Sequence, residues 1–305
     1  MRKLLCSSFG ILGLLLAVIV QAQPQAPNFP LPVQPDTLRI LGVGNSFTDD
    51  GMMYLPDLLA AAGIHNVVLG RLYYPGCSLR QHCEFDAADA PRYIYYKSTQ
   101  NRWETVSDAA TLREGVEDEC WDVLVLQQSS AYSGAYFSYE PWLGRLIERV
   151  RYYCPNAGAC VAWQMTWSYG SASDHDAFPR YDRNSQTMYE AIVDAVRRMM
   201  EQTGIEVVIP TGTAVENLRA GAFNNPPLDF TRDGYHLDEE CGRYTAACTW
   251  FQTLVAPCLQ TDIRGNAFRP ASTRHTAVTE ERAAACQDAA RKACIRRFSV
   301  WKQPR

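Results

Sequence analysis

The sequence predicts an α/β protein, a three-layer α/β/α sandwich built around a five-stranded parallel sheet. Short β-branched and apolar runs alternate with longer segments of helical periodicity through most of the 305 residues. The run at residues 122–126 is short and apolar, which is typical of a parallel strand that is buried on both faces. In such sheets ligands bind beyond the carboxyl ends of the strands, so functional residues are expected just after the strands.

The elements follow in chain order. A first strand at residues 37–43 leads into a helix at residues 50–62, which Gly63 ends as a C′ residue. Two runs, at residues 93–97 and 103–106, predict a hairpin. The other predicted strands are residues 67–72, 122–126, 160–164 and 206–209. The other predicted helices are residues 139–153, 181–202, 238–254 and 279–297.

The first residues have the features of a secretory signal peptide. Arg2 and Lys3 precede an apolar run, and a small-residue cleavage site follows at Ala22. An uncleaved membrane anchor is the alternative, but the run is short for a bilayer span. The mature protein is therefore expected to be exported, to the periplasm, the cell surface or the medium. No stable membrane insertion is expected after signal cleavage.

The rest of the chain reads as one α/β domain with short additions. Residues 23–36 are rich in Pro and Gln and predict a linker. The α/β domain is expected at residues 37–260, followed by a helical extension at residues 261–305. The formal net charge is −4, and there is no basic cluster of the kind that binds nucleic acid.

The cysteines suggest disulfides. Of the 11 cysteines, only Cys6 falls in the predicted signal peptide, which leaves an even number, as expected in an oxidising compartment. Sequence spacing alone does not settle the pairing, and free buried thiols are the alternative. Structural zinc is disfavoured because the chain has no C-x-x-C pair. The pairs with short spacing are Cys77 and Cys83, Cys154 and Cys160, and Cys286 and Cys294.

Three residues have the chemistry of a serine hydrolase. Ser46 follows the first predicted strand, and Asp233 and His236 lie three residues apart near the other end of the domain. Such an Asp can hold the imidazole while the His takes the proton of a serine nucleophile. Taken alone, Ser46 could be a helix N-cap and Asp233-Gly234 an ordinary turn. Their combination after strand ends favours a catalytic triad.

Several blocks together resemble the SGNH/GDSL hydrolase superfamily, and more closely its uncharacterised branch common in gut Bacteroidetes. The resemblance covers roughly residues 38–256 and includes Gly76, which follows the second predicted strand. The blocks are Gly44-Asn45-Ser46-Phe47, Leu126-Gln127-Gln128-Ser129-Ser130, Gln164-Met165-Thr166-Trp167 and Thr231-Arg232-Asp233-Gly234-Tyr235-His236.

The resemblance implies a flavodoxin-like fold and a role for each matching residue. Ser46 corresponds to the nucleophile, His236 to the general base and Asp233 to the residue that orients the histidine. The oxyanion hole would use the N–H groups of Ser46 and Gly76. Where the superfamily has an asparagine, this chain has a glutamine pair, and Gln128 (or Gln127) is expected as the third donor.

The expected function is that of a secreted serine esterase that removes acyl groups, above all O-acetyl, from a glycan through an acyl-Ser46 intermediate. No metal or organic cofactor is expected, because the serine mechanism needs none. Asp174-His175-Asp176 could be a metal or acid/base cluster, but such a trio is more often a solvated loop. Gln164, Trp167 and Tyr132 are expected to contact the substrate. The alternatives are a non-catalytic glycan-binding protein on the same fold and a lipid or thioester acylhydrolase.

Overall fold

The structure is a computed structural model that describes residues 31–271 and 277–301. The predicted signal peptide at residues 1–22 and most of the predicted linker at residues 23–36 lie outside the described residues. Among the helices that are described, none is long and apolar enough to span a bilayer.

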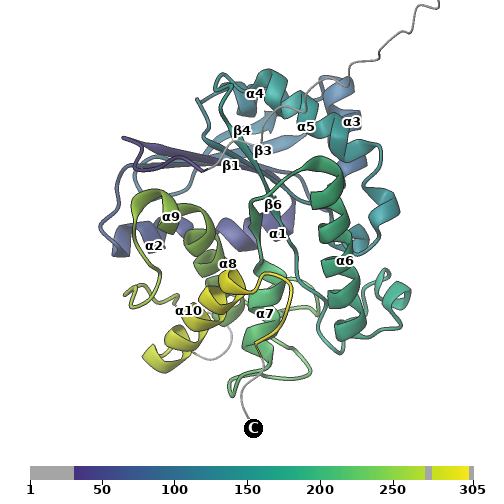
Figure 1. The fold of residues 1–305 in the computed structure, drawn as a ribbon, viewed down its shortest axis with the longest axis vertical. Helices are drawn as coiled ribbons and strands as arrows, with labels where there is room; N and C mark the ends of the chain where they lie inside the picture. Colours follow the sequence, from purple (N-terminus) through teal and green to yellow (C-terminus); the bar gives the residue numbers. More distant parts are fainter. Residues whose placement is uncertain (1–30, 272–276, 302–305) are drawn as a thin grey trace, which may run out of the picture.

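A seven-stranded sheet forms the centre of the fold, in the order β4-β3-β2-β1-β5-β6-β7 (Figure 1). Strands β2, β1, β5, β6 and β7 pair in parallel and correspond to the five predicted strands. The strands are β1 (Leu38–Gly44), β2 (Val67–Tyr73), β3 (Tyr93–Ser98), β4 (Glu104–Ala110), β5 (Val123–Leu126), β6 (Cys160–Gln164) and β7 (Val208–Ile209).

The predicted five-stranded sheet has to be corrected to seven strands. The predicted hairpin is β3 and β4, and β3 pairs antiparallel with β2 at the edge of the parallel strands. Joining the sheet satisfies backbone groups of β2 that would otherwise remain unpaired. β4, at the outer edge, is mostly exposed, which gives it no apolar alternation to mark it as part of a sheet.

The two faces of the sheet pack into separate apolar cores, as a three-layer sandwich requires. Along β1, Leu41 and Val43 lie in one core, and Leu38 and Ile40 lie in the other. β5 alternates in the same way, because successive side chains of a strand point to opposite faces. Figure 1 shows α3, α4 and α5 on one side of the sheet and α2, α8 and α10 on the other.

Helices cover both faces of the sheet. The long helix α6 begins at the cap Asn184 and ends at Gly204, whose positive φ of 67° closes it. The helices are α1 (Ser46–Met52), α2 (Leu55–Ala61), α3 (Leu79–Ala87), α4 (Leu112–Glu117), α5 (Trp142–Tyr153), α6 (Ser185–Thr203), α7 (Thr211–Arg219), α8 (Cys241–Trp250), α9 (Ala256–Leu259) and α10 (Glu280–Ile295).

Helical structure differs from the prediction at several places. The helix predicted at residues 50–62 is two helices, α1 and α2, because Pro56 lies in the first turn of α2 and cannot continue a preceding helix. α3, α4, α7 and α9 are not predicted. α3 and α4 each begin with a capping box, Ser78 with Gln81 and Thr111 with Glu114, which is a signal that the sequence does carry.

The C-terminal helix α10 packs on α7 and α8 and adds to the same core as β1 and β5. The expected disulfides are not present among the described residues, because the ten cysteines there are all free thiols. None of the suggested pairs Cys77–Cys83, Cys154–Cys160 and Cys286–Cys294 is bonded. Most of these thiols are buried and pack as small apolar groups.

Two glycines should respond to alanine in opposite directions. A Cβ at Gly212 in α7 would lie 2.2 Å from the backbone oxygen of Thr166, whereas a Cβ at Gly144 in α5 would meet nothing within 4 Å. We expect Gly212→Ala to lower the free energy of unfolding by about 1–3 kcal/mol or more. Gly144→Ala should raise it by about 0.5–1 kcal/mol, because alanine favours helix. Urea unfolding of both variants checks this, and a neutral Gly212→Ala would contradict the close packing.

Candidate active site

Ser46 lies at the carboxyl end of β1, where the chain turns into α1. Asn45 has an extended backbone with φ of −132° and caps the helix, since its side chain accepts a hydrogen bond from the N–H of Phe47 at 2.9 Å. Ser46 is thus the first residue of α1 and not its cap, contrary to the alternative that the sequence left open. Its hydroxyl is free for another partner.

Asp233 and His236 lie on a tight loop closed by its own backbone. Thr231 and Leu237 form an isolated antiparallel bridge, and the N–H of Arg232 donates to the carbonyl of His236 at 2.9 Å. Gly234, at the tip, has a φ of +89°, and a Cβ there would lie 2.9 Å from Ser173 Cα. Glycine is therefore required for this loop to turn where it does.

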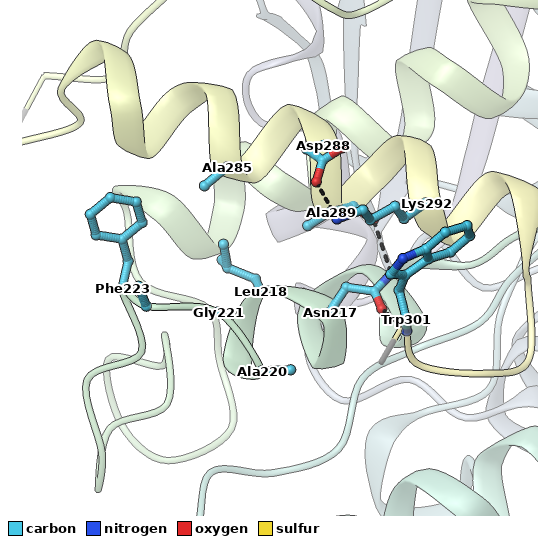
Figure 2. A pocket seen from close by; sticks show the side chains of 11 residues that line it. Asn217, Leu218, Ala220, Gly221, Phe223, Ala285, Asp288, Ala289, Lys292 and Trp301 are labelled. Carbon is cyan, nitrogen blue, oxygen red and sulfur yellow. Dashed lines mark hydrogen bonds and ion pairs between the residues drawn. The ribbon is translucent and has the colours of Figure 1, made fainter. Parts of the chain in front are cut away.

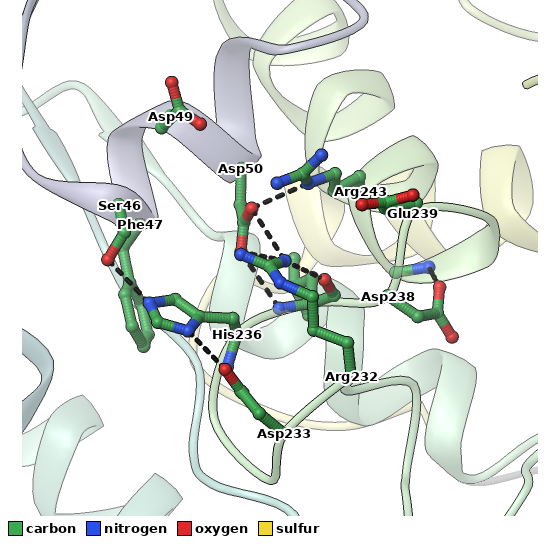
Figure 3. Close-up of polar contacts among 12 residues, drawn as sticks. Ser46, Phe47, Asp49, Asp50, Arg232, Asp233, His236, Asp238, Glu239 and Arg243 are labelled. Atoms are coloured by element: carbon green, nitrogen blue, oxygen red, sulfur yellow. Dashed lines mark hydrogen bonds and ion pairs between the residues drawn. The ribbon is translucent and has the colours of Figure 1, made fainter. Parts of the chain in front are cut away.

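The loop and α1 bring the three residues into one chain of hydrogen bonds (Figure 3). His236 Nε2 lies 2.8 Å from Ser46 Oγ, and His236 Nδ1 lies 2.6 Å from Asp233 Oδ2. An ionised carboxylate accepts hydrogen bonds only, so Nδ1 carries the hydrogen and Nε2 is left to accept from the serine hydroxyl. This is the arrangement of a nucleophile, a base and the group that orients the base.

Asp233 is held in its ionised form. Partial burial raises its pKa, but hydrogen bonds from the His236 side chain and from the N–H groups of His236 and Tyr235 outweigh this and bring the pKa to about 2. The carboxylate therefore stays charged across the neutral and mildly acidic range. It can fix the imidazole tautomer throughout that range.

The triad opens onto a cavity of about 490 Å³. Its wall is rich in polar groups, among them Asp49, Tyr73, Tyr132, Arg232 and Tyr235. Tyr132, predicted to contact substrate, is 40% exposed and lines the cavity. Ser46, Gly76 and His236 line it as well.

Two backbone N–H groups at this cavity are available to a ligand. Neither the N–H of Ser46 nor that of Gly76 has an acceptor among the residues that the structure describes. Gly76 has a φ of +63°, and a Cβ there would meet no atom within 4 Å, since the position faces open space. Both groups belong to the predicted oxyanion hole.

The prediction of Gln128 as an oxyanion donor has to be corrected. Its Nε2 donates to the carbonyl and the hydroxyl of Ser138, at 3.2 and 3.1 Å, so both amide hydrogens are used. Its Oε1 accepts from the N–H of Leu79 at 3.1 Å, at the start of α3. Gln128 is buried and does not line the cavity, so it supports the loop around Gly76 and has no hydrogen left for an oxyanion.

Gln127 is also turned into the protein. Its Nε2 donates to Asn45 Oδ1 at 2.6 Å, and its Oε1 accepts from Thr48 Oγ1 at 2.8 Å. Asn45 in turn donates to the carbonyl of Cys77 at 3.0 Å. This buried network ties the Ser46 turn to the loop that carries Gly76.

Two residues predicted to contact substrate are buried supports instead. Gln164 is fully buried and donates to the carbonyl of Phe47 at 3.1 Å. Trp167 stacks on the ring of Phe47 with a centroid separation of 4.2 Å and donates to the carbonyl of Tyr235 at 2.8 Å. Neither lines the cavity. Gln164 is the last residue of β6 and Trp167 follows three residues later, so both lie in the layer beneath the site.

Charged residues that were not predicted lie beside the triad. Asp49 lines the cavity and pairs with Arg71 Nη1 at 2.9 Å, and the Arg71 guanidinium lies over the rings of Tyr96 and Trp103, 4.4 and 4.6 Å from their centroids. The adjacent Asp50 is fully buried. The sequence signal for these charged residues was the pair Asp49-Asp50, which follows Ser46 within α1.

A second cavity lies apart from the triad. A cavity of about 210 Å³ lies between α7 and α10, with Phe223 and Trp301 at its ends (Figure 2). Its polar groups pair among themselves, as Asp288 does with Lys292 at 2.6 Å. Across the described part of the chain, no group of three or more His, Cys, Asp or Glu side chains could hold a metal ion, so the Asp174-His175-Asp176 trio does not converge on one.

Comparison with known proteins finds one family along most of the chain. The DUF4886 family, described as a domain of unknown function, matches residues 39–290. The crystal structure of a DUF4886 family protein from Bacteroides uniformis has 34% sequence identity and a TM-score of 0.78. The match covers 87% of this chain and 98% of that chain.

Two enzymes of solved structure are similar at a lower level. Axe2, an acetylxylan esterase from Geobacillus stearothermophilus, has 13% identity and a TM-score of 0.47, over 72% of this chain and 95% of that chain. LAE5, an alpha/beta hydrolase enzyme from the metagenome of Lake Arreo, has 12% identity and a TM-score of 0.46 over the same shares, 72% and 95%. These values are too low to transfer an activity. No curated protein matches significantly.

The low pKa of Asp233 predicts a pH-dependent contribution to stability. A carboxyl with a pKa of about 2 in the folded protein and 3.8 without its partners stabilises the fold above the higher value. That contribution should be lost as the pH falls through about 2. Urea unfolding of the wild type and of Asp233→Asn between pH 7 and pH 2 checks this, with Asp108→Asn at an exposed position of β4 as the control.

The stability difference between wild type and Asp233→Asn should be constant above about pH 5 and shrink towards pH 2. A difference that stays constant down to pH 2 would show that the hydrogen bonds to Asp233 do not favour its ionised form.

Proposed function

Because the chain belongs to the DUF4886 family, whose description leaves the activity open, we propose an activity from the site itself: hydrolysis of a carboxylic ester through an acyl-Ser46 intermediate. One observation carries this proposal, the 2.8 Å contact between Ser46 Oγ and His236 Nε2 with Asp233 on the other ring nitrogen. A serine hydroxyl is a weak nucleophile unless such a base is in place.

Acylation begins when Ser46 Oγ attacks the ester carbonyl and His236 Nε2 takes the hydroxyl proton. Asp233 holds the Nδ1–H and stabilises the imidazolium that forms. The tetrahedral intermediate collapses, and the departing alcohol takes the proton from Nε2. Water then attacks the acyl-Ser46 carbonyl with His236 again acting as base, and the acid product leaves as Ser46 recovers its proton.

The developing oxyanion would bind the N–H groups of Ser46 and Gly76. Neither N–H has an acceptor among the described residues, and both residues line the cavity. Two backbone N–H groups form the oxyanion hole of trypsin-like serine proteases. Turnover is therefore compatible with Gln127 and Gln128 amides that bond inside the protein and not to the oxyanion. Their role in this proposal is to hold the loops that carry the donors.

For the substrate, we propose an O-acylated glycan with a short acyl group such as acetyl. The support is the polar wall of the cavity, where Asp49, Tyr73, Tyr132 and Arg232 can bond with sugar hydroxyls. A long acyl chain would need an extended apolar groove. Export, to the periplasm, cell surface or medium, stays part of the proposal and rests on the signal-like residues 1–22.

A fluorophosphonate should form an adduct on Ser46. We expect peptide mapping by mass spectrometry to place the phosphonate on Ser46 of the wild type and to find none on Ser46→Ala. Ser46→Ala should also lose acetate release from acetylated xylan or pectin by about 10⁴-fold or more. A folded wild type with no adduct and no turnover but with affinity for the glycan would favour the binding-protein alternative.

Asp49 should contribute to recognition of hydroxylated substrates more than to the reaction step. Asp49→Asn is expected to lower kcat/KM for an acetylated xylo-oligosaccharide by about 10-fold or more, because a hydrogen bond to a charged group is lost. p-Nitrophenyl acetate, which has no sugar hydroxyl, should be hydrolysed at nearly the wild-type rate. The ratio of the two rates controls for partial unfolding.

Equal losses on both esters would remove Asp49 from substrate recognition. A wild type that prefers long-chain over acetyl p-nitrophenyl esters would instead favour the lipid acylhydrolase.

A further inference from the structure

Asp50 is a buried acid that the triad itself does not use. It lies on α1 four residues after Ser46, so both side chains project from the same side of the helix. Its side chain is fully buried and projects from α1 towards the loop that carries His236 (Figure 3). A buried carboxylate is costly unless hydrogen-bonding partners surround it.

Asp50 accepts hydrogen bonds from three residues. Oδ2 accepts from the N–H of Leu237 at 2.9 Å, and Oδ1 accepts from Arg243 Nε at 2.7 Å. Arg232 Nη1 lies 3.1 and 3.3 Å from the two oxygens. Burial raises the pKa of Asp50, and the charges of Arg243 and Arg232 oppose that rise. With only donors around its oxygens, the carboxyl is bound as the anion.

These contacts reach both sides of the catalytic loop. Leu237 directly follows His236, so the Asp50–Leu237 hydrogen bond holds the backbone next to the imidazole. Arg232 directly precedes Asp233, its side chain also donates to the carbonyl of Leu237, and its N–H donates to the carbonyl of His236. Asp50 therefore joins the helix that carries the nucleophile to the loop that carries the base.

We propose that Asp50 is a positioning residue that sets the distance between Ser46 and His236. The proposal rests on the proposed esterase function. Ser46 and His236 are 190 residues apart in sequence. Their hydrogen bond is short enough for proton transfer only if the catalytic loop stays at a fixed distance from α1. Asp50 fixes that distance because it lies on the same helix as Ser46 and bonds the loop directly and through Arg232.

The main test is Asp50→Asn, which keeps the size of the side chain and removes its charge. We expect a loss of about 30-fold or more in the rate of Ser46 labelling by a fluorophosphonate and in kcat for p-nitrophenyl acetate. KM should stay within about 3-fold, because Asp50 does not line the cavity. A folded variant that is labelled at the wild-type rate would overturn the proposal, even if its melting temperature were lower.

A matched pair of variants keeps the test valid if Asp50→Asn does not fold, since removing one partner of a buried ion pair can be strongly destabilising. Arg232→Met and Arg243→Met each remove one ion pair with Asp50, and the two side chains are similarly buried, 20% and 13% exposed. Only Arg232 also bonds the loop. We expect Arg232→Met to lower the labelling rate by about 10-fold or more and Arg243→Met by less than about 3-fold. Equal losses would overturn the proposal.

Crystal structures of the wild type and of Asp50→Asn, or of Arg232→Met if needed, separate this proposal from the function on which it rests. A wild type without labelling or turnover would end the esterase proposal. Positioning would then be decided by the Ser46 Oγ to His236 Nε2 distance alone. A distance that lengthens in the variant supports the role, and an unchanged contact overturns it.

Discussion

The register of the parallel strands is the constraint on which the site depends. Gly44 lies beside Tyr73 across β1 and β2, and Gly42 lies beside Val125 across β1 and β5. The three loops that leave these strands therefore begin at one edge of the sheet, and they line one cavity. A slip of one residue would turn each strand's side chains to the opposite face and exchange the two cores. The apolar alternation that builds the fold thus also fixes the geometry of the catalytic edge.

Much of this fold could be predicted from the sequence because its parallel strands are short apolar runs with partners on both faces. The attachment of the hairpin could not. β4 is an exposed edge strand that joins the sheet only through β3, and the antiparallel pairing of β3 with β2 spans the unpredicted helix α3. The division between α1 and α2 could be read from Pro56, which a helical periodicity alone does not weigh.

At the site, the spacing and motifs single out Ser46, Asp233 and His236, and the structure places them within hydrogen-bonding distance. The direction in which a buried amide side chain points could not be predicted from the sequence. Gln127 and Gln128 are adjacent, yet one binds Asn45 and the other Ser138, because tertiary neighbours decide which partners an amide meets. The same holds for Asp50, whose partner Arg243 is 193 residues away.

The distribution of thiols has a practical consequence for spectroscopy. Among the residues that the structure describes, Cys120 is the one cysteine classed as exposed, and it immediately precedes Trp121 near the start of β5. Burial raises the pKa of Cys83, Cys160 and Cys294 to about 11, so their thiolates are scarce at neutral pH. Among the described cysteines, a maleimide dye would therefore attach mainly at Cys120, at the end of the sheet opposite the cavity. There it could report global unfolding by fluorescence without touching the substrate.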